Sequence, residues 1–260
     1  MLFIQMGNNK VSKFILGGNP FSAVSHLGTE TDEKMRRYFT VEQVKEILRD
    51  AETHEVNTII ARGDAHISRL MYEYHNEGGK IQWLTQTCPE FASIDSSIGG
   101  ALLGGAIGCH IHGGVADYHL ANGKEDELPE MVTKIKKAGL LAGIAGHNPA
   151  VFEWAKENLD VDYFMCSYYN PIPRVNNASH IHGFDEQFLT EDRDAMVAII
   201  KDLPKPVIHY KVLAAGRTEP REAFAFVKKH LRENDAACIG IFPQVKRDML
   251  AEDIELLTKK

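Results

Sequence analysis

Hydrophobic and polar positions divide the chain into two alternating kinds of segment. Eight short runs rich in apolar and β-branched residues are separated by stretches in which apolar residues recur at helical spacing. Runs that are apolar at nearly every position are typical of strands in a parallel sheet covered on both faces. The predicted strands are residues 14–20, 57–64, 81–87, 106–113, 140–147, 162–171, 205–213 and 237–242.

The segments between the strands carry the start and stop signals of helices. Thr40 begins a capping-box pattern, and Asn148 followed by a proline predicts an N-cap with a first-turn proline. Thr190 is expected to open a helix in the same way, and Gly139 follows a basic helix end as a stop signal. Eight strands, seven intervening helical segments and a helical tail predict an α/β protein with a single (β/α)8 TIM-barrel domain over residues 1–260. An open doubly wound sheet is the weaker alternative, because no Gly-x-Gly-x-x-Gly turn follows the first strand.

Two connections are longer than the others, residues 19–39 after the first strand and residues 170–189 after the sixth. Both follow the carboxyl ends of strands, and this face carries the active site in (β/α)8 barrels. We therefore expect both segments to lie over the C-terminal face as candidate lids. The second contains His180 and His182, for which a solvated loop position is the first interpretation and a lid role the second.

Composition narrows the classes of partner. Of the 260 residues, 44% are hydrophobic, and the formal charge is −7 with lysines and arginines scattered along the chain. The apolar share is sufficient for a core, and the basic stripe that nucleic-acid binding requires is missing. Four widely spaced cysteines favour reduced thiols in a cytoplasmic protein, and no apolar run is long enough to cross a membrane. The expected partner is a small-molecule substrate.

The stretch IGCHIHGG places two histidines near the end of the fourth predicted strand. Strand side chains alternate between two faces, so His110 and His112 point to the same side, roughly 6 to 7 Å apart along the chain. Cys109 and Ile111 are then the residues that pack against helices. Two neighbouring inward imidazoles need more hydrogen-bond partners than an apolar lumen offers, which favours a functional site over a core position.

Other predicted strand ends contribute further polar candidates. They are Arg62, Asp64 and His66 from the second strand, Gln86 from the third, His147 from the fifth, Tyr169 and Asn170 from the sixth, and His209 and Lys211 from the seventh. Simpler interpretations stand beside the functional ones. Arg62 and Asp64 could form a structural ion pair, His66 could be a helix cap or first-turn residue, and His147 could bond to loop backbone. An inward Lys211 would need a carboxylate or an anionic ligand.

Six stretches occur in order over nearly the whole chain: MGNNKVSKFILGGNPF, EVNTIIARGDAHIS, GLLAGIAGHNPAVFEWAKE, DYFMCSYYNP, VIHYKVLAAGR and IGIFPQVKRDMLAEDIELL. Together they resemble the aldo/keto reductase family, whose members are (β/α)8 barrels. The resemblance implies hydride transfer from NADP, assisted by an aspartate, a tyrosine, a lysine and a histidine. In this chain the corresponding positions are Ile60, about Ala65, Gln86 and His112, so three of the four catalytic groups are replaced.

The first functional hypothesis is an enzyme that acts on a small polar substrate, sugar-like or a carbonyl compound, through a histidine-rich site. A divalent metal (zinc, manganese or iron) could assist, and hydrolysis, isomerisation and elimination all stay open. The candidate catalytic residues are His112, His110, Asp64 and Lys211; the candidate substrate-binding residues are Arg62, Gln86, Tyr169 and Asn170; the candidate metal ligands are His110, His112, His147, His209 and His66.

Two alternatives remain beside this hypothesis. An NADP-dependent oxidoreductase is implied by the resemblance, and residues 214–217, AAGR, could approach a cofactor phosphate through their backbone. A ligand-binding barrel without catalysis is the other alternative, because a fold does not determine a function.

Overall fold

The computed structural model describes residues 1–179 and 186–259, and His180 and His182 lie outside the described residues. Its eight barrel strands are β3 Phe14–Gly17, β4 Thr58–Arg62, β5 Gln82–Gln86, β6 Gly108–Ile111, β7 Leu141–Gly146, β8 Tyr163–Ser167, β9 Val207–Tyr210 and β10 Ala236–Gly240. They are parallel and close into a barrel in the order β10-β3-β4-β5-β6-β7-β8-β9. Each strand overlaps one predicted segment, so the predicted (β/α)8 fold is confirmed.

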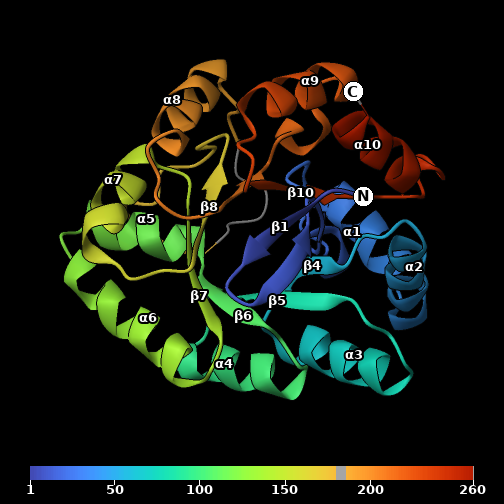
Figure 1. Cartoon of the computed structure of the whole chain (residues 1–260), viewed down its shortest axis with the longest axis horizontal. Helices are drawn as coiled ribbons and strands as arrows, with labels where there is room; N and C mark the ends of the chain where they lie inside the picture. Colours follow the sequence, from blue (N-terminus) through green and yellow to red (C-terminus); the bar gives the residue numbers. More distant parts are fainter. Residues whose placement is uncertain (180–185, 260) are drawn as a thin grey trace.

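Helices ring the barrel on its outer side (Figure 1). In the described residues they are α1 Thr29–Tyr38, α2 Val41–Thr53, α3 Ala65–Asn76, α4 Ile94–Leu103, α5 Gly113–Ala121, α6 Leu128–Lys137, α7 Pro149–Asn158, α8 Thr190–Ile200, α9 Pro220–His230 and α10 Met249–Thr258. Three short 3-10 turns are η1 Pro20–Ser22, η2 Glu125–Glu127 and η3 Ala214–Gly216. Across the described part of the chain, each helix is too short or too polar to cross a bilayer.

Most of the predicted helix signals act as expected. The Thr40 hydroxyl accepts the Gln43 N–H at 3.2 Å, and the Asn148 side chain accepts the Ala150 N–H at 3.0 Å. The exception is Thr190, which is the first residue of α8 instead of its cap. Leu189 occupies the N-cap position with an extended backbone and provides no side-chain oxygen. This helix therefore begins without the side-chain cap that the sequence predicted.

An antiparallel hairpin precedes the barrel and was not predicted. Its strands, β1 Phe3–Met6 and β2 Asn9–Ser12, are too short to show a clear alternation. Ile4, Met6 and Val11 are buried in one apolar cluster with lumen residues such as Ile15. The hairpin thus covers the end of the barrel at which the strands begin, and Figure 1 shows it inside the ring of helices.

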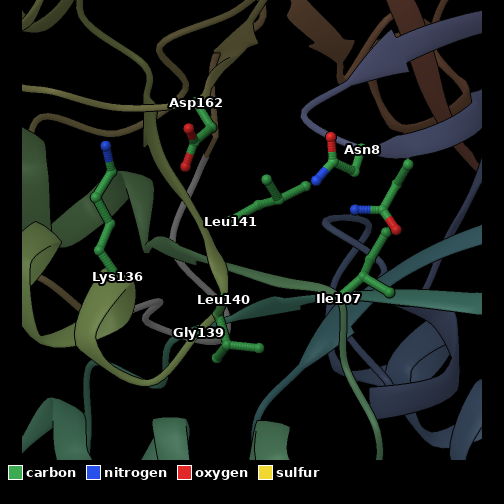
Figure 2. Close-up of a pocket in the computed structure, with 8 residues that line it drawn as sticks. Asn8, Ile107, Lys136, Gly139, Leu140, Leu141 and Asp162 are labelled. Atoms are coloured by element: carbon green, nitrogen blue, oxygen red, sulfur yellow. The ribbon is translucent and has the colours of Figure 1, made fainter.

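A cavity of about 400 Å³ lies beside the hairpin turn. Figure 2 shows Asn8 from the turn on one side of it and Lys136 and Asp162 on the other. Both charged groups already have partners, because Asp162 accepts the Ala142 N–H at 2.8 Å and Lys136 pairs with Asp160 at 2.5 Å. In such barrels this end is associated with stability and the opposite end with catalysis.

The strand alternation separates two layers of side chains. Cys109 and Ile111 belong to the core between the strands and the helices, as the sequence predicted. His110 faces the lumen, where its ring lies against the buried Tyr163. Around it the lumen cluster contains apolar side chains such as Ile60, Leu84 and Ile208.

Asp235 is the most heavily bonded buried carboxylate of the barrel wall. It lies just before β10 and accepts the Val207 N–H at 2.9 Å and the Arg232 guanidinium at 2.8 and 2.9 Å. His209 donates to it from Nε2 at 3.3 Å. Burial alone would raise the pKa of Asp235, but the hydrogen bonds from His209 and Arg232 outweigh it and lower the pKa to about 2. This carboxylate ties β9 to β10, its neighbour in the barrel.

Substitution of Asp235→Asn should lower the free energy of unfolding by roughly 2 to 4 kcal/mol, because it removes the charge that several buried donors share. The folded-state pKa lies below the unfolded value of about 4, so the stabilisation is present above pH 4 and is lost as pH falls towards 2. Urea denaturation at several pH values measures both effects. Glu33 offers a control, because it forms an exposed ion pair with Arg36 and Glu33→Gln should leave the stability nearly unchanged.

Candidate active site

A small cavity of about 50 Å³ lies at the carboxyl ends of the barrel strands. Five of the predicted candidates line it: Arg62, Gln86, His112, His147 and Lys211. The two long connections contribute Asn19, Val24 and Arg174, and the remaining lining residues are Gly113 and Tyr210. We call this space the C-terminal cavity. Its position is the one at which barrels of this class carry their active sites.

His112 ends the turn from β6 into α5 and acts as the N-cap of that helix. Its Nδ1 accepts the Gly114 N–H at 3.0 Å, so a neutral ring carries its proton on Nε2. Burial, followed by the neighbouring His147 and Arg174, lowers the pKa of His112 well below its usual value. The ring is therefore neutral at physiological pH, and it offers the cavity an N–H donor instead of a positive charge.

His110 lies deeper in the lumen than the cavity. Its Nδ1 is 3.1 Å from the Tyr163 hydroxyl, and its Nε2 has no hydrogen-bond partner within residues 1–179 and 186–259. Burial lowers the pKa of His110 to about 3, so it stays neutral. The inward direction expected from the sequence is observed, but the two imidazoles occupy different depths and only His112 lines the cavity.

Asp117, His147 and Tyr210 form a hydrogen-bonded chain that ends at the cavity. The Asp117 carboxylate accepts the Nδ1–H of His147 at 2.6 Å and the backbone N–H groups of His147 and Asn148 at 3.0 and 3.1 Å. The Nε2 of His147 is then an acceptor, and it lies 3.2 Å from the Tyr210 hydroxyl. That hydroxyl is also 3.3 Å from the Gly146 carbonyl. We call this chain the Asp117 relay.

The ionisation of the relay follows from its burial. Burial lowers the pKa of His147, although the charge and hydrogen bond of Asp117 oppose this effect. Burial and the charge of Asp117 raise the pKa of Tyr210 well above its usual value. At rest the imidazole and the phenol are both neutral, so the phenol can pass a proton to His147 only as a ligand reacts.

The relay was only partly visible in the sequence. His147 was a candidate, but Asp117 and Tyr210 were not, because Asp117 lies inside a helix and Tyr210 stands between two other candidates on β9. One signal was the double glycine after His112. A Cβ on Gly113 would lie 3.0 Å from the Tyr210 hydroxyl and 3.0 Å from Cε1 of His147, so a glycine lets the relay approach α5.

His209 does not face the lumen, and the expectation that it points inward is wrong. Ile208 and Tyr210 are the inward residues of β9, so His209 between them faces the helices. There it accepts from the Tyr168 hydroxyl at 2.9 Å and donates to Asp235. It is fully buried, and its hydrogen bonds stabilise the barrel wall.

Asp64 and His66 also lie apart from the cavity lining. The Asp64 side chain caps α3 by accepting the Ile67 N–H at 2.9 Å, and it holds Arg62 in an ion pair at 3.1 Å. Arg62 also pairs with Glu90. His66 is exposed in the first turn of α3. These are the simpler interpretations that the sequence left open, and Asp64 acts on the cavity only through Arg62.

Tyr169 and Asn170 do not line the cavity either. Tyr169 is buried against Phe188, and the Asn170 backbone N–H donates to Asp192 at 3.1 Å. Both follow β8 and belong to the start of the long connection.

The predicted metal ligands are not brought together. His110 lies below the cavity, His209 faces the helices and His66 is exposed, which leaves His112 and His147 at the cavity. Within the described part of the chain, no group of three or more histidine, cysteine, aspartate or glutamate side chains is placed to hold a metal ion. The residues therefore do not fit the metal centre expected from the sequence.

A nicotinamide nucleotide does not fit the cavity in this conformation. Cavities that hold cofactors and drug-sized ligands are typically about 300 to 1,000 Å³, and this one has about 50 Å³. The Lys211 and Arg174 side chains both line this small space. A ligand of only a few heavy atoms is consistent with the space that the described residues leave.

Comparisons with known proteins concern the fold. No known family model and no curated protein matches the sequence. Among solved structures, a candidate aldo-keto reductase from Pseudomonas aeruginosa gives a TM-score of 0.65 at 15% identity, covering 98% of this chain and 94% of that one. An aldo-keto reductase from Bacillus halodurans gives 0.60 at 13% identity, covering 100% and 91%. The phospho-2-dehydro-3-deoxyheptonate aldolase of Thermotoga maritima gives 0.58 at 11% identity, covering 99% and 72%.

These similarities extend over essentially the whole chain at low identity. The chain therefore has an aldo-keto reductase-like (β/α)8 barrel, which confirms the resemblance seen in the sequence at the level of the fold. A shared barrel does not carry an activity with it, because unrelated chemistries use this fold.

The close approach at Gly113 generates a test of the site geometry. Gly113→Ala should lower the free energy of unfolding by roughly 1 to 3 kcal/mol, because its Cβ meets both the His147 ring and the Tyr210 hydroxyl. Gly99→Ala in α4 is the control, since a Cβ there meets nothing within 4 Å and alanine favours a helix. Urea denaturation compares the two variants. Equal stability of both would show that the relay does not pack against α5 as described.

Proposed function

We propose that this chain is an enzyme that catalyses proton transfer next to the carbonyl group of a small anionic or hydroxylated substrate. The reaction class is isomerisation or elimination. The observation that carries the proposal is the Asp117 relay, which places a hydrogen-bonded phenol at a cavity beside a neutral imidazole N–H donor. These are the groups that proton abstraction and enolate stabilisation require.

The steps follow from the hydrogen bonds. The Tyr210 hydroxyl passes its proton to Nε2 of His147, and Asp117 stabilises the imidazolium that forms. The phenolate oxygen then takes a proton from the carbon next to the substrate carbonyl. His112 donates its Nε2–H to the carbonyl oxygen, which becomes negative in the enolate. In a substrate with an α-hydroxyl, that hydroxyl gives its proton to the former carbonyl oxygen, and return of the carbon-bound proton from Tyr210 to the former carbonyl carbon completes an isomerisation. Loss of a leaving group from the next carbon completes an elimination.

The charges around the cavity favour an anionic substrate. The guanidinium groups of Arg62 and Arg174 line it, and no acidic residue lines it within the described part of the chain. Arg174 is buried and forms no ion pair within the described residues, and its Nε lacks a hydrogen-bond partner there. The carboxylates of Asp117 and Glu186 stabilise its charge only from a distance. A buried guanidinium without a direct ion pair is costly, and a carboxylate or phosphate of the substrate would lower this cost.

The replaced positions argue against the aldo/keto reductase mechanism. Ile60 is a buried lumen residue, and Ala65 is the first, exposed residue of α3, so neither supplies a proton donor. The hydroxyl at the cavity comes instead from Tyr210 on β9. This difference supports proton transfer without a nicotinamide as the function that fits the cavity best.

Exchange of substrate protons with solvent deuterium tests the proposal. With glycolaldehyde, dihydroxyacetone and hydroxypyruvate in D2O, the wild-type protein should accelerate loss of the α-proton signal in proton NMR spectra. Tyr210→Phe should slow this exchange by roughly 100-fold or more, because it removes the proton-transfer atom. Asp117→Asn should slow it by roughly 10- to 100-fold, because His147 loses its orienting partner.

Tyr72→Phe provides the matched control, since Tyr72 is exposed on α3 and should leave the exchange unchanged. Equal exchange by the wild-type protein and Tyr210→Phe contradicts the proposal, as does exchange no faster than in buffer. Consumption of NADPH with the same compounds, with hydride transferred to the carbonyl carbon, would establish the reductase alternative instead.

A further inference from the structure

Two consecutive residues, Tyr210 and Lys211, line the same cavity. Neighbouring residues of a strand normally point to opposite faces, so this requires a break in the strand geometry. The break is at Lys211, whose φ is +57, a left-handed conformation that is costly for a residue with a side chain. Strain of this kind persists where the surrounding structure holds it, and it is concentrated at functional sites.

A second strained residue faces Lys211. His26, from the connection after β3, has a φ of +61, and its Nε2 lies 2.8 Å from Nζ of Lys211. Arg217 donates to the His26 carbonyl at 2.9 Å and holds that backbone in place. Two residues in unfavourable conformations thus meet through their functional atoms, which is the arrangement expected when the contact itself is useful.

The His26 ring is oriented to accept a proton from the amine. Its Nδ1 lies 2.9 Å from the Glu186 carboxylate, so Nδ1 carries the proton of the neutral ring and Nε2 is an acceptor. Glu186, His26 and Lys211 therefore repeat the order of carboxylate, imidazole and reactive group found in the Asp117 relay. One carboxylate–imidazole pair is directed at a phenol, and the other at an amine.

The surroundings of Lys211 favour the neutral amine. It forms no ion pair within residues 1–179 and 186–259, and the guanidinium groups of Arg174 and Arg217 lie near it. Burial lowers the pKa of Lys211 to about 8, against the opposing effect of Glu186. A solvated lysine is neutral in only about one molecule in 300 at pH 8, whereas roughly half of the Lys211 side chains would be neutral there.

We infer that Lys211 is a nucleophile that forms a Schiff base with the carbonyl carbon of the substrate, a deepening that rests on the proposed function. His26 first takes one proton from the ammonium group. The neutral Nζ then attacks the carbonyl carbon, the N–C bond forms, and the C=O π electrons move to oxygen. A second proton passes from nitrogen to that oxygen, and His26 returns the first one as the oxygen leaves as water. The sum is ammonium plus carbonyl giving iminium plus water.

The iminium explains why two carboxylate–imidazole pairs, Asp117 with His147 and Glu186 with His26, are directed at residues of one cavity. A positively charged nitrogen on the former carbonyl carbon withdraws electrons from the neighbouring C–H bond. Tyr210 is the residue adjacent to Lys211 and lines the same cavity, so the group that activates the carbon and the group that takes its proton come from one short stretch of chain. The substrate class is then a small aldehyde, ketone or keto acid with a removable α-proton.

Reductive trapping tests the inference on the full-length protein. The wild-type protein is incubated with hydroxypyruvate or glycolaldehyde and sodium cyanoborohydride, which reduces an iminium to a stable amine, and the modified lysine is located by peptide mass spectrometry. We expect one adduct per chain, with at least roughly ten-fold more label on Lys211 than on any other lysine. Lys211→Arg should lose this adduct, while the exposed-site control Lys246→Arg should keep it.

His26→Gln gives a second readout that a merely structural role would not move. The pH at which labelling is half-maximal should fall in this variant, because the ammonium group loses a hydrogen bond that favours its charged form. The maximal rate of labelling should fall as well, because the amine loses the imidazole that takes its proton. Label spread evenly over surface lysines, or no label on the wild-type protein, overturns the inference without needing any variant to fold. If Lys211 is not labelled but deuterium exchange depends on Tyr210, the Schiff base is contradicted and the proposed function stands. If Lys211 is labelled but no exchange occurs, proton transfer is contradicted and the Schiff base stands.

Discussion

The hydrogen bonds to the Asp117 carboxylate are the interaction on which the candidate site depends. One side chain of α5 accepts from the His147 ring and from two consecutive backbone N–H groups where β7 runs into α7. These bonds fix the position of the His147 ring and also select its tautomer. The tautomer in turn decides that Nε2 accepts from Tyr210. Without the carboxylate, the phenol at the cavity would have no defined proton acceptor.

The fold was largely predictable because its physical requirement is simple. A strand buried on both faces needs apolar side chains at nearly every position, and that requirement marked all eight barrel strands. The hairpin of β1 and β2 left no comparable mark, because four residues per strand are too few to display an alternation. The start of α8 was mispredicted because Thr190 resembles a cap in sequence, whereas the backbone places Leu189 there.

The site was predictable only where a polar residue type occurred at a strand position whose inward direction the sequence also defined. His112 and His147 follow strands whose inward positions the sequence defines, and both line the cavity. At the end of β9 the sequence HYK is polar at every position, so it does not show which residues face the lumen. The prediction that His209 faces inward was wrong. Lys211 reaches the cavity because its backbone is left-handed, and not because of the alternation of strand side chains. The hydrophobic pattern of the sequence does not reveal such a conformation. Asp117 was missed because it is a helix residue placed by tertiary packing.

The closure of the barrel has a consequence for how the chain acquires its structure. β10, residues Ala236–Gly240, pairs with β3, residues Phe14–Gly17, so the ring joins segments from opposite ends of the sequence. During synthesis, β3 and β9 present bare strand edges until β10 leaves the ribosome, and such edges are templates for pairing with other chains. Contacts over so large a sequence separation also form slowly. The barrel therefore leaves these two edges open to pairing with other chains until β10 is in place between them.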